Sequence, residues 1–176
     1  MTLWVFGYGS LLWNPGFEVA QEIPATLADY ARSFCMRSIH HRGTEADPGL
    51  VLALDETAGA TCNGVAMRAA TGTEAETLAY LRDRELISSA YVERMLEITL
   101  EGGQTVQAVT YVIDADHVQY CGGLPLEEQA HIIAHAVGGR GPNSEYLYNT
   151  AQHLKKLGVA DPDLDWLSRR VAAILA

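Results

Sequence analysis

The spacing of apolar residues predicts mainly strands in the first half of the chain, and strands followed by helices in the second. A Gly102-Gly103 pair between two apolar runs is a strong hairpin signal. The segment between residues 25 and 39 is long and irregular for a strand. The predicted strands are Leu3–Tyr8, Ala25–Ile39, Leu50–Leu54, Thr61–Ala69, Val92–Glu101 and Thr105–Asp114.

Apolar positions three and four apart predict the helices. Thr73 is placed to cap the first of them, with Glu76 at the third helical position as in a capping box. Pro125 suits the start of the second, and Gly158 is placed to end the third. Core stripes are expected from Leu126, Ala130, Ile133 and Val137, and from Leu164, Leu167, Val171 and Leu175. The predicted helices are Glu74–Leu86, Leu126–Val137, Asn143 or Ser144 to Lys156, and Asp163–Leu175.

Strands first, one embedded helix and helices at the end favour an α+β fold, a small mixed β-barrel with helices packed outside it. With 176 residues and no low-complexity linker, residues 1–176 are expected to form a single domain.

Composition narrows the choice of partner. The net charge of −10 argues against nucleic acid, which needs clustered Lys and Arg, and against an anionic membrane surface. Three cysteines without a C-x-x-C pair indicate free thiols in a reducing compartment. Neither a signal peptide nor a run of about eighteen apolar residues occurs. We therefore expect a soluble cytoplasmic protein. The negative charge does not exclude a small anionic ligand, because local backbone amides can outweigh the global field. The oligomeric state is not readable from the sequence.

The most informative segment is Gly7-Tyr8-Gly9-Ser10-Leu11-Leu12, which follows an apolar run. A strand that breaks into Gly-x-Gly-Ser can turn sharply and bring unpaired N–H groups close to a carboxylate or an oxyanion. The alternative is a tight turn that opens a first β-hairpin. The segment is no dinucleotide fingerprint, because Leu12 stands at the third glycine position, and the Gly138–Gly141 loop lacks the Lys-Ser/Thr of a P-loop.

Glu85 stands out among the acidic residues. It follows Leu78 and Leu81 on one helical stripe, so a carboxylate ends an apolar face. Partial desolvation there is expected to raise its pKa toward the range of a useful general base. The alternative is a surface Glu that pairs with Arg82.

Other candidates carry weaker signals. His131 and His135 have the i, i+4 spacing of two metal ligands, but the Glu of H-E-x-x-H is missing. The cluster His40-His41-Arg42-Gly43 ends a strand and could support an anionic ligand or form a solvated loop. Ser10 and the cysteines lack the motifs of nucleophiles.

Taken together, four segments resemble the ChaC family of γ-glutamylcyclotransferases, in that family's order and at similar separations. The first is the most specific. They are Val5-Phe6-Gly7-Tyr8-Gly9-Ser10-Leu11, His41-Arg42-Gly43, Tyr80-Leu81-Arg82-Asp83-Arg84-Glu85 and Asn143-Ser144-Glu145-Tyr146-Leu147.

The resemblance implies a γ-glutamylcyclotransferase-like fold and cleavage of glutathione to 5-oxoproline and cysteinylglycine, with no metal or organic cofactor. Glu85 is then the general acid/base. The Y-G-S-L loop, Tyr8 to Leu11, holds the γ-glutamyl group. The candidate substrate-binding residues are Val5, Phe6, Gly7, Tyr8, Gly9, Ser10, Leu11, Arg42 and Tyr146. For the last two, a surface ion pair (Arg42) and helix packing (Tyr146) are the alternatives.

The chain departs from many animal members of the family after Glu85. Those members continue with Lys-Gly-Gly-Tyr, whereas residues 86–91 here are longer and lack the glycines, as in bacterial members. Other γ-glutamyl dipeptides or amines therefore remain as alternative substrates. A binding module without turnover and a metal-dependent hydrolase built on the two histidines are the alternative functions.

Overall fold

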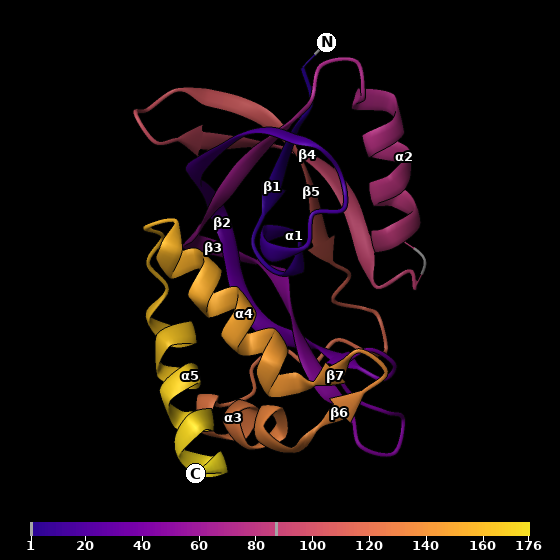
Figure 1. Ribbon diagram of the computed structural model, residues 1–176, viewed down its shortest axis with the longest axis vertical. Coiled ribbons are helices and arrows are strands. Elements are labelled where there is room, and N and C mark those ends of the chain that lie inside the picture. The colour runs from indigo at the N-terminus through magenta and orange to yellow at the C-terminus, as the bar shows by residue number, and fades with distance from the viewer. Residues whose placement is uncertain (1, 87) are drawn as a thin grey trace.

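The structure is a computed structural model that describes residues 2–86 and 88–176. Its centre is a closed barrel in which the strands are hydrogen-bonded in the order β1-β3-β2-β4-β5 (Figure 1). A parallel contact between Val5 and Val109 joins β1 to β5, and the other pairings are antiparallel. The strands are β1 (Trp4–Gly7), β2 (Val19–Ser38), β3 (Gly49–Ala69), β4 (Tyr91–Leu100) and β5 (Thr105–Ile113).

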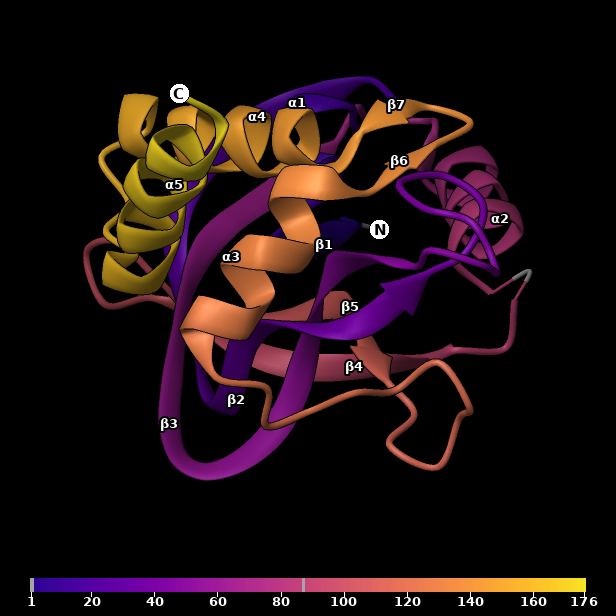
Figure 2. The ribbon, with the colours of Figure 1, turned by 90° about the horizontal axis from the view of Figure 1, so that it is seen from below.

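The helices fall into two groups. Helices α3 (Leu126–His135), α4 (Asn143–Lys156) and α5 (Pro162–Leu175) gather beside one another, whereas α2 (Glu74–Glu85) lies on the other side of the barrel (Figures 1 and 2). The short helix α1 (Ser10–Trp13) lies between them, and a small hairpin joins α3 to α4. Its strands are β6 (Val137–Gly138) and β7 (Gly141–Pro142). The predicted α+β fold, a mixed barrel with helices outside it, is confirmed.

The hydrophobic core has two main parts. One fills the barrel and contains Phe6, Leu54 and Ile98. The larger part lies between the barrel and the helices, where Leu147 and Leu167 are fully buried. Because this second part joins residues from both ends of the chain, the C-terminal helices are an integral layer of the fold.

Several predicted boundaries are corrected. Leu50–Leu54 and Thr61–Ala69 belong to one strand, β3, which pairs with β2 on both sides of an irregularity near Asp29, where Tyr30 lies opposite Glu56 and Ala28 opposite Thr61. The helix expected to reach Val137 ends at His135, and Val137 is 56% exposed in β6. Leu175 is also half exposed, at the end of α5, and does not belong to the core stripe.

The capping box at the start of α2 is not formed. The Thr73 hydroxyl donates to the Ala70 carbonyl oxygen at 2.7 Å, and Glu74, not Glu76, accepts the Gly72 N–H at 2.9 Å. The alternative of a β-hairpin that opens after β1 is not formed in the described residues, because β1 pairs with β3 and β5 and runs into α1, a helix that the sequence did not predict.

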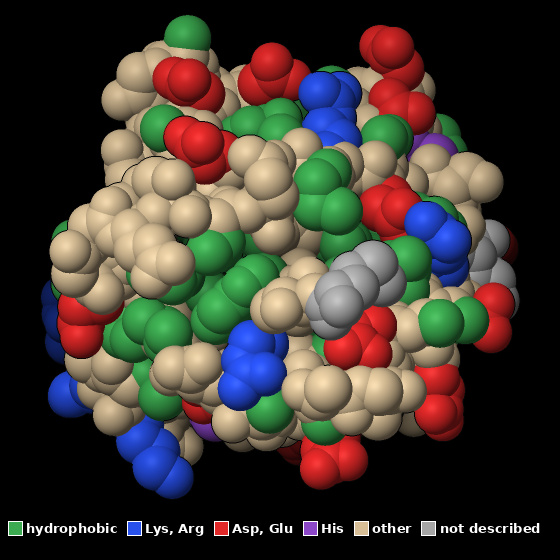
Figure 3. Space-filling model, turned by 90° about the horizontal axis from the view of Figure 1, so that it is seen from above, with side chains coloured by type: hydrophobic (Ala, Val, Ile, Leu, Met, Phe, Trp, Pro, Cys, Tyr) green, Lys and Arg blue, Asp and Glu red, His purple; other side chains and the backbone are tan. Residues whose placement is uncertain are grey.

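The surface carries the acidic charge of the chain. In Figure 3, Asp and Glu side chains are spread over the face at the top of Figure 1, with apolar side chains between them. None of the helices in the described ranges is both long and apolar enough to cross a bilayer.

Helix α4 is joined to the barrel by a buried amide. Asn143 is fully buried, its Oδ1 accepts the Leu50 N–H at 2.8 Å and its Nδ2 donates to the Leu50 carbonyl at 2.8 Å. The side chain thus pairs with β3 as a neighbouring strand would, and it holds α4 against Leu50 on the barrel side of the helix layer.

We expect Asn143→Ala to lower the free energy of unfolding by about 3 kcal/mol, because both backbone groups of buried Leu50 lose their partner. Urea unfolding followed by circular dichroism measures this. Asn149→Ala, a partly exposed position on the same helix, is the matched control and should change stability by less than about 0.5 kcal/mol. Equal losses for the two variants would contradict the role of the Asn143 amide.

Candidate active site

A cavity of about 290 Å³ lies where the end of β1, helix α1 and the C-terminal end of α2 meet the segment that follows β2. Helix α4 supplies one wall through Tyr146. The lining residues come from the whole length of the chain. They are Tyr8, Gly9, Ser10, Leu11, Trp13, Asn14, Met36, Ser38, Ile39, His40, His41, Arg42, Val51, Leu52, Arg84, Glu85, Ser88, Tyr91, Tyr111, Gln119, Arg140 and Tyr146.

The Gly-x-Gly-Ser segment forms one end of this cavity. Helix α1 begins at Ser10, so the N–H groups of Ser10 and Leu11 have no carbonyl partner within the helix. A Cβ atom on Gly9 would lie 3.3 Å from the Tyr146 hydroxyl and 3.6 Å from the Leu52 Cβ. Glycine at this position therefore lets a tyrosine pack directly against the backbone that carries the free N–H groups.

Three residues of the same motif lie elsewhere. Phe6 is buried in the core inside the barrel and Val5 in the core between the barrel and the helices. A Cβ on Gly7 would lie 2.5 Å from the Met67 side chain. None of the three lines the cavity, so the structure places Val5, Phe6 and Gly7 beneath the site, and their contact with a substrate stays a prediction. The last three residues of β1 are buried, and the chain reaches the wall of the cavity only at Tyr8.

Glu85 is the last residue of α2, and its side chain is 14% exposed. Burial raises the pKa of its carboxyl above the usual value, whereas the neighbouring Arg84 guanidinium lowers it. The alternative, a surface Glu that pairs with Arg82, is not what the structure shows, because Arg82 makes two hydrogen bonds to Glu93, at 3.0 and 2.9 Å. Glu85 is thus a partly desolvated carboxylate with one cation beside it and an open side toward the cavity.

Arg84 ties α2 to the opposite wall. Its guanidinium donates to the Ser10 hydroxyl at 3.1 Å and to the Pro15 carbonyl at 3.2 Å, and also reaches the Asn14 carbonyl. Its Nε lies 3.4 Å from Oε1 of Glu85. The sequence analysis missed this residue, and the signal was its place directly before Glu85 at the end of a helix. Through Arg84, the carboxylate and the Gly9 turn keep a constant separation.

Four tyrosines line the cavity with the Glu85 carboxylate, and three of their hydroxyl groups already donate hydrogen bonds within the protein. Tyr8 donates to the Tyr111 carbonyl at 2.7 Å, Tyr91 to the Leu52 carbonyl at 3.1 Å, and Tyr111 to Glu93 at 2.9 Å. Tyr146 instead accepts the Leu52 N–H at 3.1 Å. Its own proton is therefore free to reach a ligand.

Burial is the main cause that raises the pKa of all four tyrosines, and the Glu85 charge raises each further. They stay neutral near pH 7 and can donate hydrogen bonds. Tyr91 and Tyr111 were not among the predicted site residues. They come from β4 and β5, and only the closure of the barrel brings them to Tyr8.

The Arg42 side chain is buried, although its ion-pair partner Glu145 is half exposed. Its guanidinium carbon lies 6.0 Å from the Trp13 ring centroid and 5.8 Å from that of Tyr146. It donates to the Pro142 carbonyl at 3.1 Å and lies 3.5 Å from Glu145. The residue forms the wall between the tyrosine cluster and the β6–β7 hairpin.

The two spaced histidines lie outside the cavity. His131 Nε2 is 3.1 Å from Glu127, and His135 Nδ1 is 2.9 Å from the His131 carbonyl. Within the described ranges, no three His, Cys, Asp or Glu side chains gather in a way that could hold a metal ion. These contacts are those of an exposed helix face.

The sequence matches a family model and several known proteins. The family model of ChaC-like proteins matches residues 3–174. The chain is 38% identical over 174 residues to the glutathione-specific γ-glutamylcyclotransferase of Escherichia coli, covering 99% of this chain and 74% of that one. It is 40% identical over 157 residues to γ-glutamylcyclotransferase 2-1 of Arabidopsis thaliana, covering 84% and 72%.

A solved structure shows the same arrangement. The crystal structure of a γ-glutamylcyclotransferase specific to glutathione from yeast superimposes with a TM-score of 0.86 at 25% identity, covering 98% of this chain and 96% of that one. A structure titled γ-glutamyl cyclotransferase shares the fold at a TM-score of 0.61 and 15% identity.

The raised pKa of the Glu85 carboxyl can be measured by titration. We expect the Glu85 carboxyl to titrate above the ordinary Glu pKa of about 4.3 in NMR spectra of glutamate-labelled protein. Arg84→Gln should move the midpoint further up, because the guanidinium that favours the ionised form is gone while burial remains. Arg82→Gln is the matched control on the same helix and should leave the midpoint unchanged. A midpoint that falls in Arg84→Gln would contradict this account.

Proposed function

The chain belongs to the family of ChaC-like proteins, and we propose that it is a γ-glutamylcyclotransferase that cleaves glutathione to 5-oxoproline and cysteinylglycine. The observation that carries the proposal is one cavity lined both by a partly desolvated carboxylate, Glu85, and by the backbone that follows Gly9, where the N–H groups of Ser10 and Leu11 have no partner within the helix. The names of the relatives from Escherichia coli and yeast support glutathione as the substrate.

The reaction needs few parts because its nucleophile belongs to the substrate. The α-amine of the γ-glutamyl group attacks its own γ-carbonyl carbon, and a five-membered lactam closes as the C–N bond to the cysteine nitrogen breaks. Holding the substrate in a folded conformation near attack is therefore a large part of the catalysis. The chemistry calls for no metal or organic cofactor.

Glu85 moves the proton in both halves of the reaction. The substrate α-ammonium first gives a proton to the Glu85 carboxylate, which frees the amine to attack. Protonated Glu85 then gives that proton to the departing cysteine nitrogen. The regenerated carboxylate takes the second proton from the nitrogen of the closing ring and passes it to the same leaving amine, which departs as an ammonium. A pKa raised by burial suits both steps, because it makes the carboxylate a better base without preventing the return of the proton. The neighbouring tyrosines stay protonated and act only as donors.

The substrate brings two anionic groups, its α-carboxylate and the oxyanion that develops on the γ-carbonyl. The donors available for them are the N–H groups of Ser10 and Leu11 and the uncommitted proton of Tyr146. Arg42, behind the Tyr146 ring, adds positive charge to the same region. The donors are rigid because Gly9, Leu52 and Tyr146 pack directly against one another.

The setting proposed for this activity is the cytoplasm, with a small molecule and not a nucleic acid as the partner. All three cysteines are free thiols, and Cys35 and Cys62 are buried, as in proteins of a reducing compartment. The net charge of −10 disfavours phosphate backbones.

The first experiment measures 5-oxoproline release from glutathione and from γ-glutamyl-alanine, with EDTA present. We expect Glu85→Gln to lower kcat for glutathione by about 10²–10⁴-fold, with KM within about threefold of wild type, because the amide keeps the shape but cannot accept the proton. Glu76→Gln, on an exposed face of the same helix, is the matched control and should keep full activity.

Each outcome distinguishes the proposal from its alternatives. Activity lost to EDTA would point to metal-dependent hydrolysis. Binding of glutathione without 5-oxoproline release would indicate a binding module. Turnover of γ-glutamyl-alanine in preference to glutathione would assign a different γ-glutamyl substrate. Wild-type kcat in Glu85→Gln would overturn the acid/base role.

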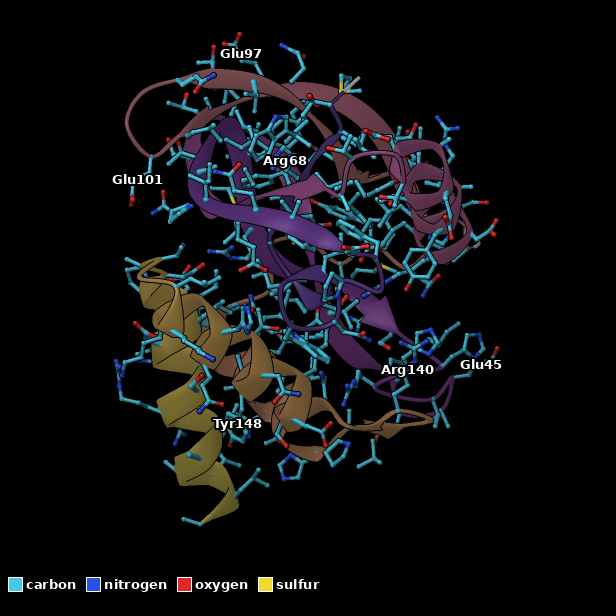
Figure 4. All side chains as sticks on the ribbon, turned by 45° about the horizontal axis from the view of Figure 1, so that its top comes forward. Glu45, Arg68, Glu97, Glu101, Arg140 and Tyr148 are labelled. Carbon is cyan, nitrogen blue, oxygen red and sulfur yellow. The ribbon has the colours of Figure 1, made fainter. Side chains whose placement is uncertain are left out.

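A second prediction follows from the hydroxyl of Tyr146, which can still donate a hydrogen bond to the substrate. Tyr146→Phe should lower kcat/KM for glutathione by about 100-fold, because a preorganised donor is removed. A fall in kcat alone would place the hydroxyl on the oxyanion, and a rise in KM alone on the α-carboxylate. Tyr148→Phe is the matched control: Tyr148 lies on the same helix and does not line the cavity (Figure 4). Steady-state kinetics within twofold of wild type for Tyr146→Phe would contradict the assignment.

A further inference from the structure

Beyond Arg42, the cavity wall carries a group of basic side chains that the mechanism above does not use. His40 and His41 belong to the segment after β2, and Arg140 lies in the turn of the β6–β7 hairpin. Figure 4 shows Arg140 at the hairpin end of the molecule, well apart from α5. We call His40, His41 and Arg140 the basic rim.

The backbone holds the basic rim in place. The Gly139 N–H donates to the His40 carbonyl at 2.7 Å, and the Arg140 N–H donates to the His41 carbonyl at 2.9 Å. A Cβ on Gly138 would lie 2.4 Å from the Gly43 nitrogen, so the two segments pack as closely as backbones can. The rim is therefore a built part of the cavity, although its two segments are about a hundred positions apart in the sequence.

The charges of the rim favour an anion. Arg140 and His40 lie close enough to His41 to lower its pKa, after burial as the larger cause. Within the described ranges, no carboxylate lies at ion-pair distance from Arg140, and the nearby Glu145 is paired with Arg42. Glu45, exposed in the loop that follows His41, also makes no ion pair there. Positive charge without a partner is notable in a chain with a net charge of −10.

Glutathione carries a carboxylate at the end of its leaving dipeptide, which is the kind of anion that the basic rim could bind. If the γ-glutamyl group lies between Glu85 and Gly9, the leaving dipeptide extends away from them and ends in a carboxylate about 7 Å beyond the scissile bond. Figure 1 shows the C-terminal end of α2 above the β6–β7 hairpin, on the same side of the barrel. The cavity that connects them is lined by both Glu85 and Arg140.

We propose that the basic rim, with Arg140 as its main cation, binds the terminal carboxylate of the leaving dipeptide and so sets the preference for glutathione over γ-glutamyl compounds without that charge. This inference rests on the proposed function. Arg140 is a specificity residue in it, remote from the reacting atoms, and the histidine N–H groups add hydrogen bonds to the same carboxylate.

The test compares glutathione with its ethyl ester at the glycine carboxylate, which removes only the terminal charge. Wild type should prefer glutathione by about tenfold or more in kcat/KM, mainly through KM. Arg140→Gln should lower that preference by about tenfold. Arg94→Gln, an exposed cation on the barrel beside Glu56, is the matched control and should keep the wild-type preference.

The outcomes separate this inference from the proposed function. Release of 5-oxoproline from both substrates, with an unchanged preference in Arg140→Gln, would overturn the rim assignment and leave the activity standing. Equal losses on both substrates in Arg140→Gln would also overturn it, since a structural role predicts them. No 5-oxoproline from either substrate with the wild-type protein would overturn the proposed function and the rim together.

Discussion

The structure depends on the hydrogen bonds that side chains form with the backbone of β3 at Leu50 and Leu52. At this end of β3, the backbone N–H and carbonyl groups of Leu50 and Leu52 form hydrogen bonds to side chains. Such buried groups must be satisfied or they cost free energy. Three side chains do this: Asn143 takes both groups of Leu50, Tyr146 the N–H of Leu52 and Tyr91 its carbonyl.

The same hydrogen bonds build the site. Tyr91 and Tyr146 reach Leu52 from positions 39 and 94 residues away, and both then line the cavity beside Glu85. Because one tyrosine donates to Leu52 and the other accepts from it, only the acceptor keeps a proton for a ligand. This wall of the cavity is thus a consequence of covering a strand edge.

Electrostatically, the cavity has an acidic end and a basic end. Glu85 is desolvated enough for its pKa to rise, but Arg84 keeps it from becoming a fully uncompensated buried charge. Toward the β6–β7 hairpin, Arg42 and Arg140 give the cavity wall positive charge, although the chain as a whole has a net charge of −10. A substrate with an ammonium near one end and a carboxylate at the other matches this order of charges.

The sequence alone determined the features that depend on local spacing. Apolar periodicity predicted the strands and the long helices, and it placed a carboxylate at the end of the apolar stripe of α2. Tertiary structure decided the partners. Pairing with β2 on both sides of an irregularity joined two predicted strands into β3. Arg82 pairs with Glu93 and not with Glu85, and barrel closure brought Tyr91 and Tyr111 to Tyr8. The physical reason is that burial patterns repeat along a helix or strand, whereas a polar group takes whichever partner the folded chain brings near it.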